Sequence, residues 1–499
     1  MSQTSNLRTN PGACPLAKKC GGCQLQNLPY PRQLKWKQAR AEILLKKFGK
    51  VDRILGMETP YHYRNKVQAA FGRTRGGKII SGVYQSGSHR IVAVDSCMIE
   101  DATADAIIVT VRALLPKFRV PVYDEDQRTG FLRHVLVKRG FATGEVMVVL
   151  VGASNYFPMK KKFTAALRER HPEITTVLLN INPKDTNLVL GDREEILFGK
   201  GYIEDVLCGC TFRISAKSFY QINPVQTEKL YGKAMALAQL DADTTVIDAY
   251  CGIGTIGLVA AKTAGRVIGV ELNPDAVRDA IVNAKRNGAE NARFYCADAG
   301  DFMQALAADG ESADVVFMDP PRAGSSTRFI NALGALQPKR IVYISCNPET
   351  LARDLAGIIK KGYAVQSITP VDMFPHTNHI ETVALLVKLP PDDVIKVKLD
   401  VSELPVSIHD GDATYPEIKA YVEQQFGLKV SSLYISQIKR KFGLTVTDSY
   451  NKPKSDNSRQ PICPPDKEKA IAEALRYLIC LKAFSESMNR QILPRGLWE

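Results

Sequence analysis

Long hydrophobic runs are absent from this chain of 499 residues. No apolar stretch reaches the roughly 18 residues that a membrane-spanning helix requires. The N-terminal residues MSQTSNLRTNPGAC also lack the hydrophobic region of a secretory signal peptide. We therefore expect a soluble protein of the cytoplasm that has no membrane partner.

Internal repeats are absent as well, and the composition shows no strong bias. Apolar residues make up 45% of the chain and charged residues 24%, which is typical of a protein that folds into globular domains. At roughly 150 residues for each domain, the length leaves room for about three of them.

A disulfide framework is not expected, although the chain contains 11 cysteines. The cytoplasm keeps thiols reduced, so clustered cysteines there more often bind metals. Cys14, Cys20 and Cys23 form the pattern C-x5-C-x2-C, and Cys97 is the candidate for a fourth ligand. Four thiolates suit a structural zinc ion or an iron–sulfur cluster, and the spacing does not separate the two. Unligated thiols are the competing interpretation, against which the close spacing argues.

Negative charge is scarce in the first hundred residues. They contain 17 Lys and Arg against 5 Asp and Glu, a balance of +12 out of the +14 of the whole chain. Such an excess at one end of a chain favours a polyanionic partner. Aromatic residues that can stack on the bases of single-stranded RNA lie in the same region: Tyr30, Trp36, Tyr61, Tyr63, Phe71 and Tyr84. The alternative is a basic face that only meets solvent.

The first half of the chain is predicted to contain two regions. Residues 1–60 are interpreted as a cysteine loop followed by an amphipathic helix over Tyr30–Lys50. Residues 61–217 are predicted to form a mixed β subdomain that faces RNA and supplies Cys97, with a single helix over about Met98–Leu115. Its β-like runs, which are separated by glycine-rich breakers, are Lys66–Gly72, Lys78–Tyr84, His134–Lys138, Val146–Val151, Thr176–Asn182 and Thr211–Ile214.

Residues 218–390 are predicted to form an α/β domain. Strand-like runs alternate there with helical ones, which is typical of a parallel sheet. Asn273-Pro274 is a helix N-cap followed by proline at the first helical position. The expected strands are Thr245–Ala249, Val267–Glu271, Ala292–Cys296, Asp314–Met318, Arg340–Ile344, Ala364–Thr369 and Thr382–Val387.

Residues 391–499 are predicted to form a small, mainly helical accessory domain after a linker rich in Pro and Asp. The helices expected there are Tyr415–Phe426, Leu433–Lys441 and Asp466–Phe484. A helix-turn-helix or winged-helix module that binds nucleic acid fits them, and so does a helical docking module. A net charge of only +1 over these residues gives nucleic-acid binding little support.

A glycine-rich segment follows the first strand of the α/β domain. Residues 248–257, DAYCGIGTIG, contain the pattern G-x-G-x-x-G, in which glycines let the backbone approach a ligand. The next strand ends at Glu271, where an acidic residue typically binds the hydroxyls of a ribose. A dinucleotide site would look the same. Asp248 before the glycines and the segment Asp319-Pro320-Pro321-Arg322 after the fourth strand favour S-adenosylmethionine instead.

The Asp-Pro-Pro segment predicts a rigid turn that directs polar groups at a substrate. Many methyltransferases that modify the amino group of a nucleobase have an aromatic residue after the prolines. Arg322 stands there in this chain, so methylation of an amino group is not expected. An ordinary strand-ending turn is the alternative.

Cys346 is the strongest candidate for a catalytic residue. It ends a strand-like run, and catalytic side chains of α/β sheets lie at the carboxyl ends of strands. A thiolate that adds to carbon 6 of uracil makes carbon 5 nucleophilic enough to accept a methyl group. We expect the N-terminus of the next helix, Glu349–Lys360, to favour ionisation of the thiol. A base must then remove the proton of carbon 5, and the residue types alone do not separate Glu381, His376 and His379.

Five segments, taken in order, resemble the RNA uracil-C5 methyltransferase family: SFYQINPVQTEKL, DAYCGIGTIGL, MDPPRAG, ISCNPETLARDL and FPHTNHIETVALL. The resemblance covers about Cys14 to Leu389. It implies a class I, Rossmann-like, S-adenosylmethionine-dependent methyltransferase domain, with Cys346 as nucleophile and Glu381 as the base that removes the carbon-5 proton. The residues that match the family's S-adenosylmethionine contacts are Gln221, Tyr250, Glu271 and Asp319, with Thr255 and Asp298 as further candidates.

The N-terminal cysteines resemble the 4Fe–4S ligands of the family branch that acts on ribosomal RNA. The resemblance therefore implies a cluster bound by Cys14, Cys20, Cys23 and Cys97, and 23S ribosomal RNA as the substrate. A tRNA uracil-C5 methyltransferase is the alternative enzyme. A non-catalytic RNA-binding or ribosome assembly factor is the alternative of a different class. A monomer is expected.

The chain departs from the family pattern at both ends. Many relatives carry a small N-terminal RNA-binding β-barrel, for which the residues before Cys14 leave no room, and residues 391–499 lie outside the family core. We expect the basic first hundred residues to take over RNA binding, with or without the C-terminal tail.

Overall fold

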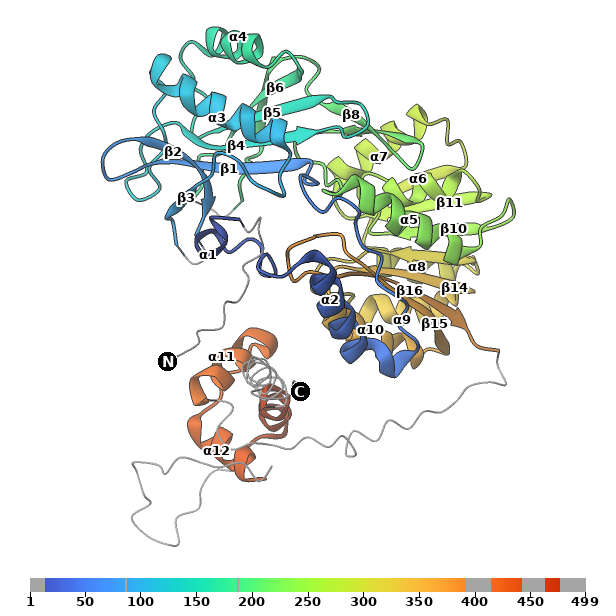
Figure 1. Cartoon of the computed structure of the whole chain (residues 1–499). Coiled ribbons are helices and arrows are strands. Elements are labelled where there is room, and N and C mark those ends of the chain that lie inside the picture. The colour runs from blue at the N-terminus through green and yellow to red at the C-terminus, as the bar shows by residue number, and fades with distance from the viewer. Residues whose placement is uncertain (1–13, 86–87, 186–187, 391–413, 442–462, 476–499) are drawn as a thin grey trace, which may run out of the picture. The chain divides into compact units, whose positions relative to one another are not determined.

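The computed structural model describes residues 14–85, 88–185, 188–390, 414–441 and 463–475 (Figure 1). The chain divides into two units, residues 1–394 and 395–499. The first unit contains two seven-stranded sheets, which correspond to the mixed β region and the α/β domain expected from the sequence. The finer domain boundaries at residues 60 and 217 stay predictions.

The N-terminal segment of the first unit contains three of the four clustered cysteines. It folds into α1 (Ala17–Cys20) and α2 (Tyr30–Leu45), and α2 has a proline in its first turn, where N–H groups lack intrahelical partners. α2 passes into the 3-10 turn η1 (Lys46–Phe48), so the α-helix is shorter than expected. The buried residues of α2 recur at every fourth position and share one face: Gln33, Lys37, Ala41 and Leu45.

The first large sheet has the strand order β3-β2-β1-β4-β5-β6-β7. Only β5 and β6 pair in parallel, so the sheet is mixed, as expected. α3 (Ala102–Lys117) and α4 (Lys160–Arg170) pack against one face (Figure 1). The other face packs on the hairpin of β8 (Ile203–Leu207) and β9 (Cys210–Ile214). The strands are β1 (Lys66–Arg73), β2 (Ile79–Tyr84), β3 (Ile91–Ala93), β4 (Leu132–Arg139), β5 (Val146–Gly152), β6 (Ile174–Ile181) and β7 (Arg193–Phe198).

Four elements of this region were not predicted: α4, β3, β7 and β8. The sequence of α4, KKKFTAALRER, is too rich in charge to show a clear apolar stripe, although Phe163 and Leu167 are buried. β3 and β7 are the edge strands of the sheet, and β7 has no buried residue. β3 has only three residues, too few to show an alternating pattern, and charged residues at the exposed positions of β7 hide its pattern. The prediction of a single helix in this region was therefore wrong.

The second large sheet has the order β12-β11-β10-β13-β14-β16-β15. Its strands pair in parallel except β16, which is antiparallel to both β14 and β15. The reversal corrects the expectation of a parallel sheet, and the short connection 372–380 explains it, because a parallel crossover needs a dozen or more residues. The strands are β10 (Thr245–Ala249), β11 (Arg266–Glu271), β12 (Ala292–Cys296), β13 (Val315–Met318), β14 (Arg340–Ser345), β15 (Tyr363–Val371) and β16 (Glu381–Lys388).

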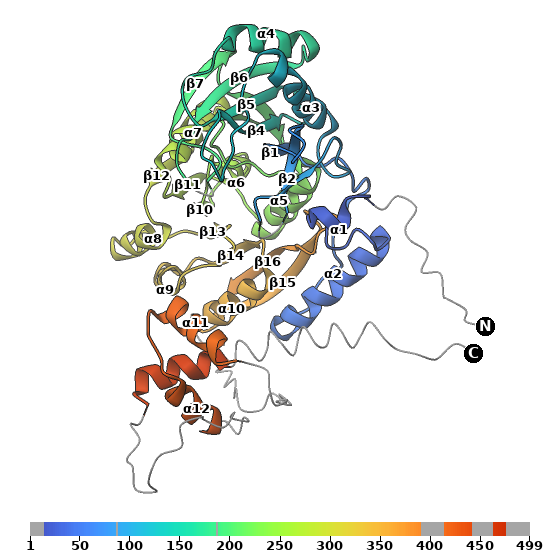
Figure 2. The ribbon, with the colours of Figure 1, turned by 90° about the vertical axis from the view of Figure 1, so that its left-hand side faces the viewer.

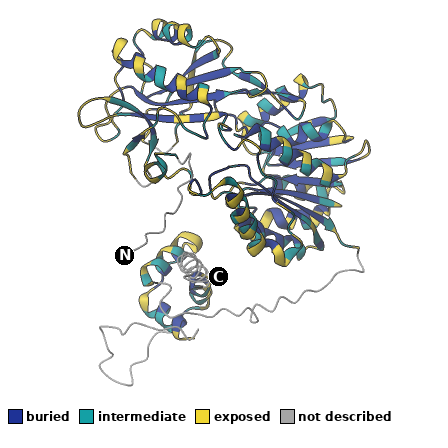
Figure 3. Cartoon of the chain, viewed as in Figure 1, coloured by how far each residue is buried: buried dark blue, intermediate teal, exposed yellow. Residues whose placement is uncertain are grey.

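Helices cover both faces of this sheet (Figures 1 and 2). Alternate residues of its strands belong to two apolar cores, one on each face of the sheet. In β14, for example, Val342 belongs to the core on the first face and Ile341 to the core on the second. Figure 3 shows the central strands as almost wholly buried. The helices on the first face are α5 (Pro224–Ala238), α6 (Thr255–Ala261) and α7 (Pro274–Arg286). Those on the second are α8 (Ala299–Ala308), α9 (Thr327–Leu336) and α10 (Pro348–Ile359), and α2 packs there against α10 and β15.

The strand order reverses beside β10. From β10 the chain builds β11 and β12 on one side and then returns to form β13 on the other. Ligands of α/β sheets bind outside the carboxyl ends of strands at such a switch point. The fold therefore directs attention to the residues that follow β10 and its neighbours.

The second unit contains three helices among its described residues: α11 (Tyr415–Phe426), α12 (Ser432–Lys441) and one over 465–475. A capping box of Thr414 and Glu417 begins α11, and Gly427 ends it in the left-handed conformation. Apolar residues of all three helices share one core. The part of the expected helix Asp466–Phe484 after residue 475 lies outside the described residues. No helix in the described ranges is both long and apolar enough to cross a bilayer.

Candidate active site

The loop after β10 turns sharply at its glycines. Tyr250, Gly252 and Gly254 have positive φ angles of 63°, 54° and 83°. A Cβ atom at Gly254 would come within 2.9 Å of the ring of Phe294, so the position requires glycine. The loop leads directly into α6, whose first N–H groups have no intrahelical partners. This cradle fits a ligand that lies across the backbone of the loop.

Glu271 at the end of β11 holds the same loop. Its carboxylate accepts hydrogen bonds from the N–H of Gly252 at 3.1 Å and from the N–H of Asn273 at 2.8 Å. A carboxylate has about four lone-pair sites, so capacity remains for the hydroxyls of a ribose. Glu271 therefore both shapes the loop and keeps acceptors free.

Asp248 lies beneath the glycine loop and is fully buried. One of its oxygens accepts the N–H of Gly257 at 2.7 Å, and Oδ1 has no hydrogen-bond partner among the described residues. Burial raises the pKa of Asp248 to about 8. Asp248 therefore holds the start of α6 from the core, and its expected role in favouring S-adenosylmethionine stays a prediction.

Four of the predicted cofactor residues lie at the carboxyl ends of neighbouring strands. Tyr250 follows β10, Glu271 ends β11, Asp298 follows β12 and Asp319 follows β13. Asp298 also caps α8, since its carboxylate accepts two backbone N–H groups at 2.9 and 3.1 Å. The fold thus gathers these four residues along one edge of the sheet, on both sides of the switch point.

The other two cofactor candidates occupy different surroundings. Thr255 begins α6, and its Oγ1 shares a hydrogen bond with the hydroxyl of Tyr231 at 3.0 Å. Gln221 is buried in the segment before α5, where its carbonyl accepts the side-chain N–H of Asn65 at 3.1 Å. Thr255 therefore belongs to the glycine loop, whereas a role for the Gln221 side chain toward the cofactor stays a prediction.

Cys346 and Glu381 lie next to each other at one edge of the sheet. Ser345 of β14 lies opposite Thr382 of β16, so the next position of each strand carries Cys346 and Glu381. Asp319 follows β13, the other neighbour of β14. The fold therefore brings a thiol and two carboxyl groups to one place, although they are far apart in the sequence.

The two carboxyl groups hold their protons more tightly than usual. Burial raises the pKa of Glu381 to about 8, the charge of Asp319 adds to the shift, and Arg322 opposes it. Burial also raises the pKa of Asp319 to about 7. Carboxyl groups that titrate near neutral pH are suited to transfer protons.

The surroundings of Cys346 raise the pKa of its thiol. Burial raises its pKa to about 11, the charges of Glu381 and Asp319 add to the shift, and Arg322 opposes it. α10 begins two residues later, and the side chain of Asn347 caps it at 3.1 Å. Burial and the two carboxyl groups act against ionisation of the thiol, and the expected help from the N-terminus of α10 stays a prediction.

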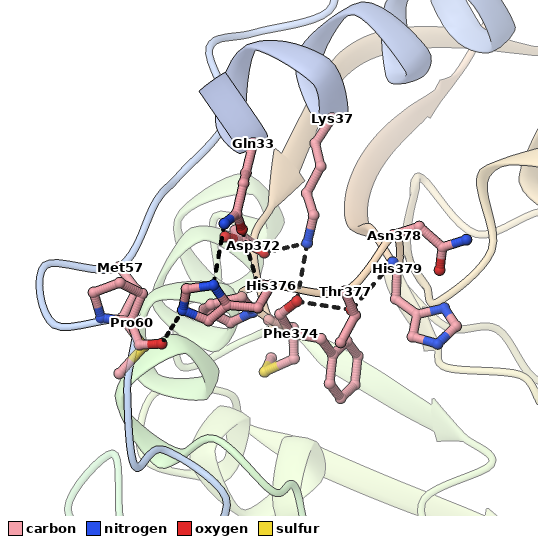
Figure 4. A network of polar contacts seen from close by, with 12 residues as sticks. Gln33, Lys37, Met57, Pro60, Asp372, Phe374, His376, Thr377, Asn378 and His379 are labelled. Atoms are coloured by element: carbon pink, nitrogen blue, oxygen red, sulfur yellow. Dashed lines mark hydrogen bonds and ion pairs between the residues drawn. The ribbon is translucent and has the colours of Figure 1, made fainter. Parts of the chain in front are cut away.

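The two histidines are less suited than Glu381 to act as the base. Both ring nitrogens of His376 are engaged: Nδ1 accepts from Gln33 at 3.1 Å, and Nε2 donates to the carbonyl of Pro60 at 2.9 Å (Figure 4). The ring of His379 contacts the guanidinium of Arg322. Burial and that charge lower the pKa of His379 to about 4. Glu381, by contrast, has a raised pKa of about 8 and lies beside Cys346.

The four clustered cysteines lie in one region of the first unit. Cys23 and Cys97 pack against the same small apolar core, and Cys14 and Cys20 are near enough to Cys23 for their charges to raise its pKa. The side chains fit four-thiolate ligation in chemistry and neighbourhood. In the described part of the chain, however, no three His, Cys, Asp or Glu side chains converge closely enough to hold a metal ion. The predicted metal site is therefore not confirmed.

The buried polar residues of α2 were not among the predicted site residues. Lys37 forms an ion pair with Asp372 at 2.5 Å, and both side chains are fully buried. Gln33 is fully buried as well. The available signal was the four-residue spacing that places both residues on the same helix face as Ala41 and Leu45, because a buried ion or amide requires a partner.

Known proteins resemble this chain over most of its length. A sequence profile of the tRNA (uracil-5-)-methyltransferase family matches residues 29–389. An uncharacterized RNA methyltransferase of Halalkalibacterium halodurans is 44% identical over 378 residues, which cover 75% of this chain and 82% of that protein. One of Oceanobacillus iheyensis is 43% identical over 392 residues, which cover 77% and 84%.

A solved structure agrees with this assignment. The crystal structure of Pyrococcus abyssi tRNA (uracil-54, C5)-methyltransferase in complex with S-adenosyl-L-homocysteine aligns with a TM-score of 0.62 and 29% sequence identity. The alignment covers 73% of this chain and 86% of that one. The family profile, the sequence relatives and the α/β fold agree, and the chain belongs to the tRNA (uracil-5-)-methyltransferase family.

Proposed function

We propose that this protein transfers a methyl group from S-adenosylmethionine to carbon 5 of a specific uridine in 23S ribosomal RNA. Membership of the family makes it an RNA uracil-5-methyltransferase. The observation that carries the mechanism is the position of Cys346 and Glu381 at facing strand ends, with Asp319 beside them. The class of RNA and the roles of single residues are the parts that need testing.

The methyl donor binds at the glycine loop in this proposal. A structural relative is known in complex with S-adenosyl-L-homocysteine, the product of that donor. Tyr250 and Thr255 belong to the loop, and Glu271, with its spare acceptor capacity, suits the ribose. The remaining proposed contacts with the methyl donor come from Asp298, Asp319 and Gln221. When bound, the donor supplies an electrophilic methyl group.

Cys346 begins the reaction by attack on the uracil. Its thiol gives its proton to solvent water, and the sulfur forms a bond to carbon 6 as the carbon 5–carbon 6 double bond opens, which makes carbon 5 nucleophilic. Arg322 supports this step, because its charge opposes the rise in the pKa of Cys346. Carbon 5 then takes the methyl group. The uridine must leave its base stack to reach Cys346, as in other enzymes that modify bases.

Glu381 completes the reaction by accepting a proton. The methylated base still carries a hydrogen on carbon 5, and its removal restores the double bond as the bond between sulfur and carbon 6 breaks. A carboxylate with a raised pKa is a stronger base than an exposed one. Burial of Glu381 therefore supports its assignment to this step.

Ribosomal RNA is proposed over tRNA because of the N-terminal cysteines, which resemble those of the branch that acts on ribosomal RNA. We include a 4Fe–4S cluster in the proposal, with Cys14, Cys20, Cys23 and Cys97 as its ligands. The shared neighbourhood of these thiols supports it. No step of methyl transfer needs the cluster. An anaerobically purified protein with a brown colour supports this part, and a colourless, iron-free protein removes it.

A tRNA is the second candidate substrate. The family profile is named for tRNA, and the structural relative acts on uracil 54 of tRNA. Base-resolved mapping of 5-methyluridine, in cells with and without the gene, tests the choice. Loss of a methyl group from 23S ribosomal RNA supports the proposal. Loss from tRNA alone rejects it in favour of the second candidate.

A further inference from the structure

The connection between β15 and β16, residues 372–380, leads directly into Glu381. Its internal hydrogen bonds centre on Thr377, whose N–H and hydroxyl donate to the carbonyl of Phe374 at 3.2 and 2.8 Å. His376 has a φ of 69°, in the left-handed region that residues other than glycine rarely adopt. A strained connection with few bonds of its own must be held from outside.

Helix α2 makes the first set of contacts that hold this connection from outside. The ammonium of Lys37 donates to Asp372 at 2.5 Å and to the carbonyl of Phe374 at 3.0 Å (Figure 4). The hydroxyl of Tyr30 donates to the other oxygen of Asp372 at 2.8 Å. The side chains of Lys37 and Asp372 are fully buried. A buried charged pair that is held by several hydrogen bonds has one geometry rather than several.

Gln33, one turn before Lys37, makes the second set of contacts with the connection. Its side-chain oxygen accepts the N–H of His376 at 2.9 Å, and its Nε2 donates to the His376 ring at 3.1 Å. Nε2 of the same ring donates to the carbonyl of Pro60. The amide of one glutamine thus holds both the backbone and the ring of the strained residue.

The third set of contacts with the connection comes from the residues that follow Cys23 directly. The N–H of Leu25 donates to the carbonyl of His376 at 2.9 Å, and the side chain of Gln24 accepts the N–H of Asn378 at 3.3 Å. The cysteine loop is therefore joined by hydrogen bonds to the connection that ends at Glu381.

Helix α2 also reaches the other catalytic strand end. Arg40 forms an ion pair with Glu349 in the first turn of α10, the helix that begins two residues after Cys346. The same helix thus contacts the chain next to the proposed nucleophile and the chain next to the proposed base. These contacts come from a segment outside the α/β domain.

We propose that the N-terminal segment Gln24–Arg40 positions the catalytic pair, with Lys37, Asp372 and Gln33 as positioning residues for Glu381. The inference rests on the proposed function, because it assigns these residues to the proton-removal step. A buried ion pair is weak evidence for stability, since apolar residues of similar volume often serve equally well. Placement of a reacting group, by contrast, depends on fractions of an ångström.

The test uses two variants of the full-length protein. Lys37→Met combined with Asp372→Leu removes the ion pair without leaving one charge buried alone, and Gln33→Leu removes the amide without changing any charge. Lys339→Met is the control, because Lys339 pairs with Asp314 at 2.7 Å at the opposite end of the strands that lead to Cys346 and Asp319. Thermal unfolding shows whether each variant folds. If the double variant does not fold, Gln33→Leu alone tests the inference.

The expected result separates the two chemical steps. Both variants should form the covalent adduct with RNA that carries 5-fluorouridine at a rate within about twofold of the wild type. On normal RNA their kcat should fall about 10- to 100-fold with little change in KM, the scale expected for a misplaced reacting group. Methylated RNA should remain attached to the protein, as for Glu381→Gln. The control should match the wild type.

Two contrary outcomes have different meanings. If adduct formation and turnover fall together, or if only KM rises, the segment has a general structural role and the inference is wrong. If the wild type itself forms no adduct with fluorouridine RNA, the proposed function fails instead.

Discussion

Cys346 and Glu381 occupy facing positions, each one residue beyond the last paired residues of two antiparallel strands. Their connection through the backbone ladder fixes the distance between nucleophile and base without any bond between their side chains. The charge of Glu381 also makes Cys346 harder to ionise, because it raises the pKa of the thiol. The pair is therefore suited to work in sequence, first by thiolate attack and then by proton removal.

The first prediction concerns the nucleophile. Wild-type protein should form a stable covalent adduct with RNA that carries 5-fluorouridine at the target, because fluorine cannot leave as a proton does. Cys346→Ala should form none. Cys208→Ala is the matched control, since that thiol is also half-buried and has a pKa raised to about 11, but lies in the β8–β9 hairpin. Denaturing gels detect the adduct, and its survival in Cys346→Ala would remove Cys346 from this role.

The second prediction concerns the base. Glu381→Gln keeps the shape of the side chain and loses the proton acceptor, so it should add to uridine and transfer the methyl group. Release should then slow by about 10²- to 10⁴-fold, the usual scale for loss of a general base. Protein that carries methylated RNA should accumulate on denaturing gels. Normal turnover in this variant would assign proton removal to another group.

The third prediction is a difference in pH dependence between the two steps. Cys346 has a pKa of about 11, so adduct formation on fluorouridine RNA should rise up to at least pH 9, by about tenfold for each pH unit. Glu381 has a pKa of about 8, so single-turnover release should rise up to about pH 8 and then level off. Rapid-quench measurements at a series of pH values test both curves.

Arg322 provides a variant for the same measurement. Its charge lowers the pKa of both Cys346 and Glu381, so Arg322→Gln should shift both curves to higher pH. Arg266→Gln is the control, because Arg266 is an exposed residue at the start of β11, the end of the strand that lies away from the site. Curves that stay in place in Arg322→Gln would show that Arg322 does not act on these groups.

Much of the α/β domain could be predicted from the sequence, and less of the first sheet. Strands such as β14 are buried on both faces and show as continuous apolar runs between turns. β7 has no buried residue, and the charged sequence of α4 hides its apolar face. The reversal of β16 depends on the connection 372–380, whose length became informative only once both strand ends were known.

The residue types at the site could be predicted, but their ionisation could not. Cys346, Asp319 and Glu381 stand next to strand-like runs, which is a local signal. Their pKa values depend on burial and on one another, which the chain order does not reveal. The pair of Lys37 and Asp372 joins residues 335 positions apart, so no local pattern predicts it.

The fourth prediction links the site to stability. Glu381 binds its proton more tightly in the folded protein, with a pKa of about 8 against an ordinary 4.5. Between these pH values the folded state holds more protons than the unfolded state, so stability falls as pH rises. Glu381→Gln removes this cost and should be more stable than the wild type above pH 8, by at most about 5 kcal/mol. The difference should shrink toward pH 5. Urea unfolding at several pH values measures it, and Glu290→Gln, at an exposed glutamate, should show no such trend.

The fifth prediction concerns the glycine loop. Gly254→Ala meets both a φ of 83° and the ring of Phe294 at 2.9 Å, so it should destabilise the protein by about 1–3 kcal/mol and weaken binding of S-adenosylmethionine. Gly252→Ala has a φ of 54° but no atom within 4 Å of the added carbon, so it isolates the backbone cost. Gly232→Ala, in the interior of α5 with open space around it, should leave binding unchanged and raise stability by about 0.5–1 kcal/mol. Calorimetric titration and thermal unfolding measure the three variants. If Gly254→Ala and Gly232→Ala had equal effects on binding of S-adenosylmethionine, the glycine loop would not be the donor site. An added carbon has no room at Gly254 and open space at Gly232, so a donor site built on this loop must respond to the first change and not to the second.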